Sequence, residues 1–209
     1  MFERFSEKFG PLAVGGNSEF WFSPPLAQVV GYTEIASISA GTPLGGGMFF
    51  LLSASQGDAA QEFISTGFPK TALRATPVAR DWLGRVFAVD AERKAAGLED
   101  QLLFLIEPGS GGVFDVDYSF KDLLDVGFVD DPDTYLARDF FEEWLSSGGV
   151  VPDANQCVGF TKPLFLGGSD SIENLDIVDL EVYWSLCAQL IEATRLLPPG
   201  TQVGGVSQA

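Results

Sequence analysis

Two apolar segments on either side of a turn dominate the pattern in the middle of the chain. Residues 101–107 are almost entirely apolar, residues 113–118 alternate apolar and polar side chains, and Pro-Gly-Ser-Gly-Gly lies between them. Proline fixes one backbone angle and glycine adopts positive φ freely, so this arrangement predicts a β-hairpin. Because residues 101–107 are apolar on both faces, we expect them to form a central strand.

Further strands are predicted from alternation and from short apolar runs. Residues 85–90 alternate cleanly, and residues 48–52 (MFFLL) are continuously apolar. Together with the hairpin, these segments predict a mostly antiparallel sheet. Short strands are also expected at residues 31–39, 78–82 and 163–166.

Helices are predicted where apolar residues recur at steps of three and four. Near the C-terminus this spacing places six side chains on one helix face, and Pro198-Pro199-Gly200 ends the run: Leu180, Tyr183, Trp184, Cys187, Leu190 and Ile191. Shorter helices are expected at residues 2–9, 58–66, 120–126 and 132–146. Ser119 is the expected N-cap of the third, and Asp130 or Asp131 that of the fourth.

These elements predict an α+β fold with a central, mostly antiparallel sheet and helices packed around it. We expect residues 1–209 to form a single α+β domain, because the sequence shows no internal repeat and no linker. A content of 46% apolar and 12% aromatic residues indicates a packed core.

The expected compartment is the cytoplasm. No window approaches the roughly 18–20 apolar residues that a membrane span requires, and the N-terminus lacks a secretory signal. Cys157 and Cys187 lie in apolar contexts, and in a cytoplasmic protein they are expected to be buried thiols.

Charge is the strongest global feature. The chain has 29 acidic and 12 basic residues, a net charge of −17. The segment 111–181 alone holds 16 acids and three bases, a net charge of −13, against −4 for the rest. Such a field repels nucleic acid and anionic membranes, and it attracts a basic partner.

The residues available for catalysis are few. The chain contains no histidine, so it lacks the usual nucleophile–base pairs and imidazole metal ligands. The three glycines at 45–47 run toward a predicted strand without a Lys-Ser/Thr pair, so they do not resemble a phosphate-binding loop. Asp115 with Asp117, or the acids at 130–133, could form a carboxylate pair. We expect no enzyme activity, no cofactor and no metal.

The chain also resembles known families. CVGFTKPLFLGG at 157–168, followed by ENL and DLEVYWSLCAQL, resembles the C-terminal part of bacterial immunity proteins that neutralise a type VI secreted DNase toxin. WLGRVFAVD, FLIEPGSGGVFDV and FFEEWL, further upstream, resemble the wider SUKH superfamily. The resemblance covers roughly residues 77–200. The N-terminal third departs from this pattern between residues 31 and 52.

The resemblance implies a non-catalytic protein that binds and neutralises a cognate toxin, with a nuclease as the expected target. A nuclease presents a basic cleft to phosphates, and a surface of carboxylates can compete for it. Two alternatives stay open: a regulatory or scaffold module that binds another protein or a small ligand, and a carboxylate-based hydrolase. The candidate partner-binding residues are the acids of the two middle helices and their linker: Asp122, Asp125, Asp130, Asp131, Asp133, Asp139, Glu142 and Glu143.

Overall fold

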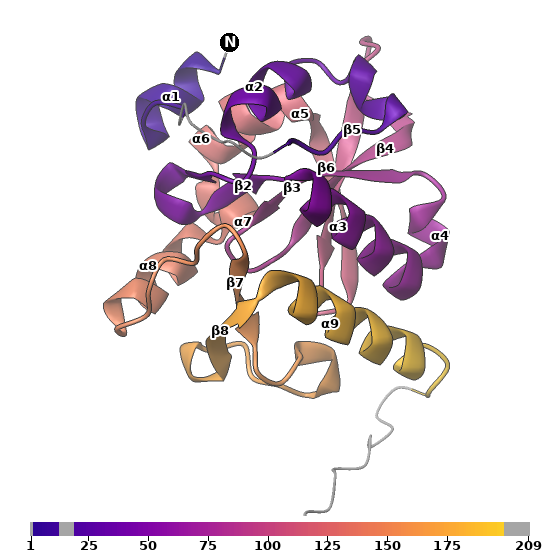
Figure 1. Ribbon diagram of the computed structural model, residues 1–209, viewed down its shortest axis with the longest axis vertical. Helices are drawn as coiled ribbons and strands as arrows, with labels where there is room; N and C mark the ends of the chain where they lie inside the picture. Colours follow the sequence, from indigo (N-terminus) through magenta and orange to yellow (C-terminus); the bar gives the residue numbers. More distant parts are fainter. Residues whose placement is uncertain (1, 13–18, 199–209) are drawn as a thin grey trace, which may run out of the picture.

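A six-stranded antiparallel sheet forms the centre of the computed structural model, which describes residues 2–12 and 19–198 (Figure 1). The strands pair in sequence order: β1 (Pro43–Leu44), β2 (Phe49–Leu51), β3 (Ala75–Asp81), β4 (Val86–Lys94), β5 (Gln101–Glu107) and β6 (Gly112–Ser119). A second, two-stranded sheet consists of β7 (Gln156–Phe160) and β8 (Leu175–Asp179). The predicted α+β class with a mostly antiparallel sheet is confirmed. The predicted domain extent, 1–209, includes residues outside the described ranges and stays a prediction.

Helices surround the sheet (Figure 1). The α-helices are α1 (Glu3–Phe9), α2 (Tyr32–Ser39), α3 (Ala54–Gly67), α4 (Pro69–Ala72), α5 (Phe120–Asp122), α6 (Phe128–Asp130), α7 (Pro132–Leu136), α8 (Arg138–Ser146) and α9 (Leu180–Thr194). A π-helical turn, Leu123–Gly127, joins α5 to α6. Short 3-10 turns are Pro24–Gln28, Gly45–Gly47, Leu164–Leu166 and Ile172–Asn174. None of the described helices is both long enough and apolar enough to cross a membrane.

The predicted hairpin is confirmed as β5 and β6. Glu107 pairs with Gly112 and Ile106 with Val113, and the Gly111 amide donates to the Glu107 carbonyl oxygen at 3.0 Å. Gly111 has φ of +67°, a left-handed conformation that a residue with a side chain adopts only at a cost. The Pro-Gly-Ser-Gly-Gly segment therefore closes the turn because its glycine adopts a positive φ, as its composition predicted.

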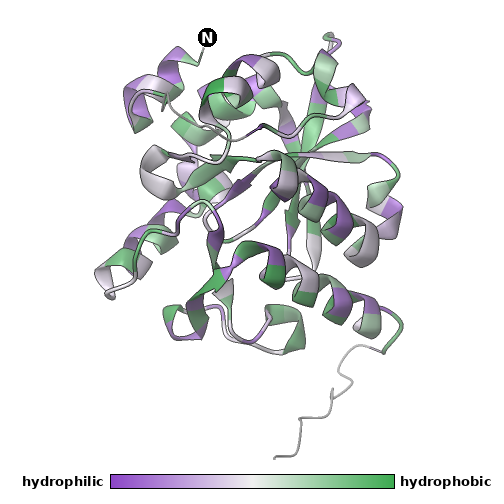
Figure 2. Cartoon of the chain, viewed as in Figure 1, coloured by the Kyte–Doolittle hydropathy of each residue, from purple (hydrophilic) through white to green (hydrophobic). Residues whose placement is uncertain are grey.

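Alternation along the central strands produces two hydrophobic clusters, one on each face of the sheet. On β4, Phe87 and Val89 belong to one cluster, and Val86 and Ala88 to the other. Because side chains on a strand point alternately to opposite faces, a strand buried on both faces needs apolar residues at every position. Colouring by hydropathy shows the resulting apolar strands at the centre of the molecule (Figure 2).

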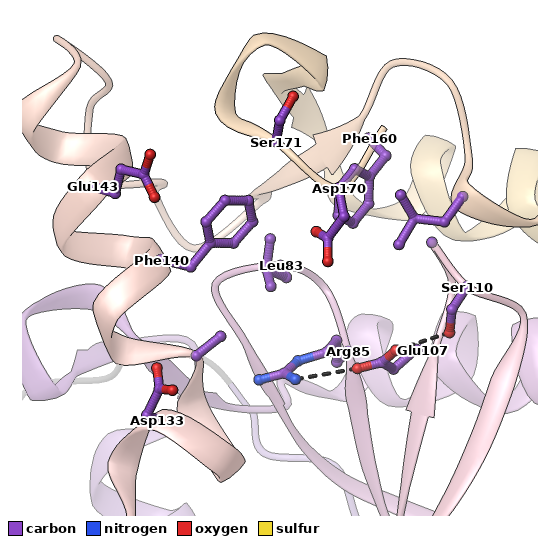
Figure 3. Close-up of a pocket in the computed structure, with 13 residues that line it drawn as sticks. Leu83, Arg85, Glu107, Ser110, Asp133, Phe140, Glu143, Phe160, Asp170 and Ser171 are labelled. Atoms are coloured by element: carbon purple, nitrogen blue, oxygen red, sulfur yellow. Dashed lines mark hydrogen bonds and ion pairs between the residues drawn. The ribbon is translucent and has the colours of Figure 1, made fainter. Parts of the chain in front are cut away.

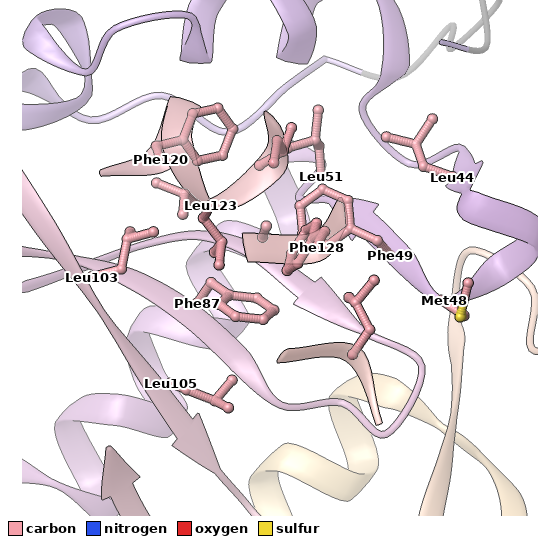
Figure 4. Close-up of a cluster of buried hydrophobic side chains, with 14 of the residues drawn as sticks. Leu44, Met48, Phe49, Leu51, Phe87, Leu103, Leu105, Phe120, Leu123 and Phe128 are labelled. Carbon is pink, nitrogen blue, oxygen red and sulfur yellow. The ribbon is translucent and has the colours of Figure 1, made fainter. Parts of the chain in front are cut away.

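The first cluster is rich in phenylalanine and lies beneath α1, α2 and the α5–α6 segment (Figure 4). Phe49 contacts Phe128 with ring centroids 5.0 Å apart, and Phe87 contacts Phe128 at 5.6 Å, both edge to face. Such pairs add about 0.5–1.5 kcal/mol each beyond the burial of area. The N-terminal helix, which was expected at residues 2–9, joins this cluster through Phe5.

The second cluster lies between the sheet and helices α3 and α9. Trp184 of α9 is buried, stacks on Phe63 of α3 with ring centroids 6.2 Å apart, and donates from Nε1 to the Gly84 carbonyl oxygen at 2.7 Å. Cys157 and Cys187 are both free and buried there, as predicted. Burial raises the pKa of the Cys187 thiol to about 12, so it stays protonated at neutral pH.

Several boundaries differ from the sequence prediction. Residues 31–39 were expected to form a strand, but Tyr32–Ser39 is helix α2, with Tyr32, Ile35, Ala36 and Ser39 buried at the spacing of a helix face. The strand expected at residues 163–166 is also absent: Leu164–Leu166 is a 3-10 turn followed by Gly167, which has φ of +81°, and the strands of this region are β7 and β8. Helix α3 starts at Ala54, earlier than expected, because Ser53 and Gln56 form a reciprocal capping box.

Candidate functional site

A cleft of about 440 Å³ opens between α7–α8 and the C-terminal segment that follows β7 (Figure 3). The turns of the β3–β4 and β5–β6 hairpins form its floor. Its lining mixes acidic, aromatic and aliphatic side chains with one arginine: Leu83, Arg85, Glu107, Gly109, Ser110, Asp133, Ala137, Phe140, Glu143, Phe160, Leu164, Asp170 and Ser171.

The helical wall contains a break that the sequence did not predict. Residues 132–146 were expected to form one helix, but Ala137 has φ of +48° and ψ of +50°, which divides the segment into α7 and α8. Asp131 caps α7 by accepting from the Thr134 amide, and Pro132 occupies the first turn, as predicted. The break places Ala137, Phe140 and Glu143, spaced by three residues, along the cleft.

Arg85 holds the floor of the cleft together. Its Nε donates to Asp81 at 2.5 Å, one terminal nitrogen donates to Glu107 at 3.1 Å, and the other to the Tyr135 carbonyl oxygen at 3.1 Å. Burial alone would lower the pKa of Arg85, but the attraction of Asp81 and Glu107 raises it above its ordinary value. Arg85 therefore stays charged and is already paired, and it leaves little positive charge for a ligand.

The β3–β4 turn is also fixed to its neighbours by tryptophan and backbone groups. Trp82 Nε1 donates to the Leu136 carbonyl oxygen of α7 at 2.8 Å. The Trp82 carbonyl oxygen accepts from the Val158 amide of β7 at 2.8 Å. The floor, the helical wall and the C-terminal wall thus meet at residues 82–85.

The free charge of the cleft is negative. Asp133, Glu143 and Asp170 are exposed, and none of them forms an ion pair with a base in the described part of the chain. Figure 3 shows Asp133 and Glu143 on the helical wall and Asp170 on the opposite wall. The half-buried rings of Phe140 and Phe160 flank them. This combination suits a lysine or arginine side chain, whose stem packs on apolar surface while its charged end meets carboxylates.

The structure brings only two of the eight predicted acids, Asp133 and Glu143, into the cleft. Asp139 and Glu142 are exposed on α8 beside it, and Glu142 pairs with Arg138 at 2.7 Å. The other four lie outside the cleft and have partners within the fold. Asp122 accepts from the Ser119 hydroxyl, Asp125 from the Phe5 amide, Asp130 pairs with Arg4, and Asp131 is the N-cap of α7.

Sequence reasoning did not select Arg85, Glu107, Phe160 or Asp170. These residues come from three separate segments, and only the tertiary fold brings them to the same cleft. The sequence offered one indication of their role: Arg85 and Glu107 are the charged ends of the strands predicted at residues 85–90 and 101–107.

One of the two carboxylate candidates for hydrolysis, Asp115 with Asp117, is bound by an arginine. Asp115 and Asp117 both lie on β6, and Arg93 binds them at 2.9 and 2.6 Å. Within residues 2–12 and 19–198, no group of three or more Cys, Asp and Glu side chains is arranged to hold a metal ion.

One protein-family model matches a C-terminal segment of the chain that includes two walls of the cleft. Residues 118–191 match the family described as T6SS immunity protein Tdi1, C-terminal. The matched segment begins at the end of β6 and ends in α9, so it includes both the helical wall and the C-terminal wall of the cleft. The expected similarity to type VI secretion immunity proteins is therefore confirmed over these residues.

A solved structure shares the fold over nearly the whole chain. The crystal structure of Atu4351 from Agrobacterium tumefaciens superposes with a TM-score of 0.64 at 15% sequence identity. The alignment covers 90% of this chain and 89% of that chain. No curated protein matches the sequence. The structural likeness shows the fold, and the family match carries the functional argument.

Proposed function

We propose that this protein is a cytoplasmic, non-catalytic immunity protein that binds and neutralises a cognate nuclease toxin of a type VI secretion system. The observation that carries this proposal is the family match over residues 118–191. The proposal retains the resemblance to the SUKH superfamily that was noted for the segments at 82–90, 104–116 and 140–145.

The matched segment coincides with the acidic part of the molecule. It holds 14 of the 16 acids found between residues 111 and 181. A nuclease gathers positive charge to hold phosphates, so its active site is complementary to such a surface. In our proposal a lysine or arginine of the toxin enters the cleft between Glu143 and Asp170, and the exposed acids of α8 surround the contact.

The proposed mechanism is occlusion, without turnover. Arg93 binds both Asp115 and Asp117 and offsets one of their two negative charges, which supports a structural role for these carboxylates. A carboxylate-based hydrolase would instead require both carboxyl groups to be free to act on the substrate and the attacking water.

The experiment compares two triple variants that change the net charge equally. The cleft variant carries Asp133→Asn, Glu143→Gln and Asp170→Asn. The control variant carries Glu34→Gln, Glu62→Gln and Glu192→Gln, three exposed acids outside the cleft. The toxin to be tested is a candidate nuclease effector chosen from the genes that neighbour the gene of this protein. The assays are inhibition of DNA cleavage and protection of cells that express the toxin.

We expect the wild type and the control variant to inhibit alike, and the cleft variant to inhibit at least about tenfold more weakly. Truncating one partner of a buried charge pair typically costs about 2–5 kcal/mol, which is more than a factor of ten. Equal inhibition by all three proteins would move the interface away from the cleft. A wild type that neither binds the nuclease nor protects the cells would reject the immunity function and favour a regulatory or scaffold role.

A further inference from the structure

A second hollow, of about 480 Å³, lies on the other side of the β5–β6 turn from the acidic cleft. It is bounded by the α3–α4 junction, the turn itself, Phe165 and the last turn of α9. The two hollows share Ser110. A volume of this size falls within the roughly 300–1,000 Å³ that small-molecule sites occupy.

The walls of this hollow are mainly apolar. Phe68, Pro69, Phe165 and Ile191 line it. Gly111 brings the hairpin backbone close, because a Cβ built at this position would lie 3.5 Å from both Ile191 and Phe165. The turn, the 3-10 segment and α9 therefore meet in direct contact, which gives the hollow a defined shape.

The charged residues of this hollow are both basic, in contrast to the rest of the molecule. Lys70 and Arg195 line it, and no aspartate or glutamate does, although the chain carries a net charge of −17. Lys70 is exposed and forms no hydrogen bond or ion pair with another residue in the described part of the chain. Arg195 donates to the Thr66 carbonyl oxygen at 2.7 Å, which fixes its guanidinium at the rim.

The hydroxyl groups of the lining are largely used within the fold. Thr194 donates to the Leu190 carbonyl oxygen at 2.7 Å, and Ser110 donates to Glu107 at 2.8 Å. Apart from the Thr71 hydroxyl, the side-chain recognition available to a ligand is therefore cationic, and it lies at the edge of an apolar pocket.

We infer that this hollow binds a small monocarboxylate with an apolar body, such as a medium-chain fatty acid. The apolar chain would lie against Phe68, Phe165 and Ile191, and the carboxylate would meet Lys70 and Arg195. Charge complementarity selects an anion, and the apolar walls select a hydrocarbon body over a hydrophilic anion such as phosphate. This site is separate from the acidic cleft and does not depend on toxin binding.

The test uses octanoate, 1-octanol and octylammonium with the full-length protein. Binding is followed by amide shifts in two-dimensional NMR, with Gly67 and Gly111 as reporters, and by calorimetry. We expect saturable shifts at these glycines with octanoate and much weaker ones with the alcohol and the amine. From hexanoate to octanoate, affinity should rise up to about fourfold for each added methylene.

Variants of one lysine sharpen the test. Lys70→Gln should weaken octanoate binding by about tenfold, as expected for the loss of a charge-assisted contact. Lys70→Glu should abolish octanoate binding and favour octylammonium. Lys162→Gln, which changes an exposed lysine outside the hollow, should bind octanoate as the wild type does.

Three results would overturn the inference. One is the absence of saturable octanoate binding at millimolar concentrations. Another is equal binding of octanoate, octanol and octylammonium, which would show a non-selective apolar surface. The third is binding of a peptide that ends in an apolar residue with a free carboxylate, without binding of octanoate, which would assign the hollow to a protein partner.

Discussion

At the scale of single residues, Ala137 is the most unusual position in the cleft. It is a non-glycine residue in the left-handed region, which costs roughly 1–2 kcal/mol for a residue with a Cβ. Its amide donates to the Asp133 carbonyl oxygen at 2.8 Å and closes α7, and its carbonyl oxygen accepts from the Phe141 amide at 2.9 Å in the first turn of α8. One strained residue thus sets the change of direction that exposes Phe140 and Glu143 to the cleft.

Ala137→Gly should therefore stabilise the protein. Glycine adopts the left-handed conformation without steric cost, although it loses about 0.5–1 kcal/mol through its freer unfolded state. The expected net gain is about 0.5–1 kcal/mol in the free energy of unfolding, measured by urea denaturation. Ala59→Gly in the middle of α3 is the matched control, and it should lower stability by about 1 kcal/mol. A loss at both positions would show that the Ala137 side chain matters more than its backbone.

At the scale of elements, α9 connects parts of the molecule that are far apart in sequence. Asp179 caps it by accepting from the Val182 amide. Its buried face packs along α3, and Trp184 reaches the β3–β4 turn through Gly84. The helix thus closes the second cluster over the sheet.

Trp184→Ala should cost about 3–5 kcal/mol of stability, because it removes a buried indole and leaves the Gly84 carbonyl oxygen without its donor. Leu186→Ala on the same helix is the control. Leu186 is 54% exposed, so its truncation should change stability by less than about 0.5 kcal/mol. Both values come from chemical denaturation. Similar small effects of the two substitutions would contradict the role given to the buried face of α9.

The elements also show which parts of this structure a sequence can reveal. The β5–β6 hairpin and α9 were predictable because strong local signals, a proline–glycine turn and a long helical period, agreed with the tertiary fold. Helix α2 was not, because the short segment GYTEIASIS contains β-branched residues that fit either period. The break at Ala137 had no local signal, since alanine is the best helix former.

The acidic character of the candidate site was predictable from the sequence, but its location was not. Acidic residues on the segment 122–143 were expected at a binding surface, and two of them, Asp133 and Glu143, line the cleft. Their neighbours Glu107 and Asp170 come from segments separated by dozens of residues, so only the folded chain identifies the cleft. The local pattern of apolar and polar residues does not show which residues distant in sequence lie close together in the folded chain.

At the scale of the whole molecule, charge is concentrated in the C-terminal part. The segment 111–181 carries a net charge of −13 out of −17, and both the helical and the C-terminal walls of the cleft belong to it. A concentrated charge extends its attraction beyond contact distance and increases the rate of encounter with a basic partner.

Association with the proposed toxin should therefore depend strongly on salt. The Debye length falls from about 10 Å at 0.1 M salt to about 3 Å at 1 M, so screening removes long-range attraction. We expect the association rate, measured by stopped flow or surface plasmon resonance, to fall at least about tenfold over this range. The dissociation rate should change much less. An association rate that does not vary with salt would show that charge does not guide the encounter.

The junction at residues 82–85 has a consequence for the thermodynamics of recognition. Trp82 and Arg85 bond to the end of α7, the Trp82 carbonyl oxygen bonds to β7, and Gly84 bonds to Trp184. The walls of the cleft therefore share one support and cannot move apart without breaking several buried contacts. A cleft held in this way is preorganised: it loses little conformational entropy when a partner arrives. Docking then resembles the meeting of rigid bodies, and the amide hydrogens of this junction should exchange only when the whole fold opens.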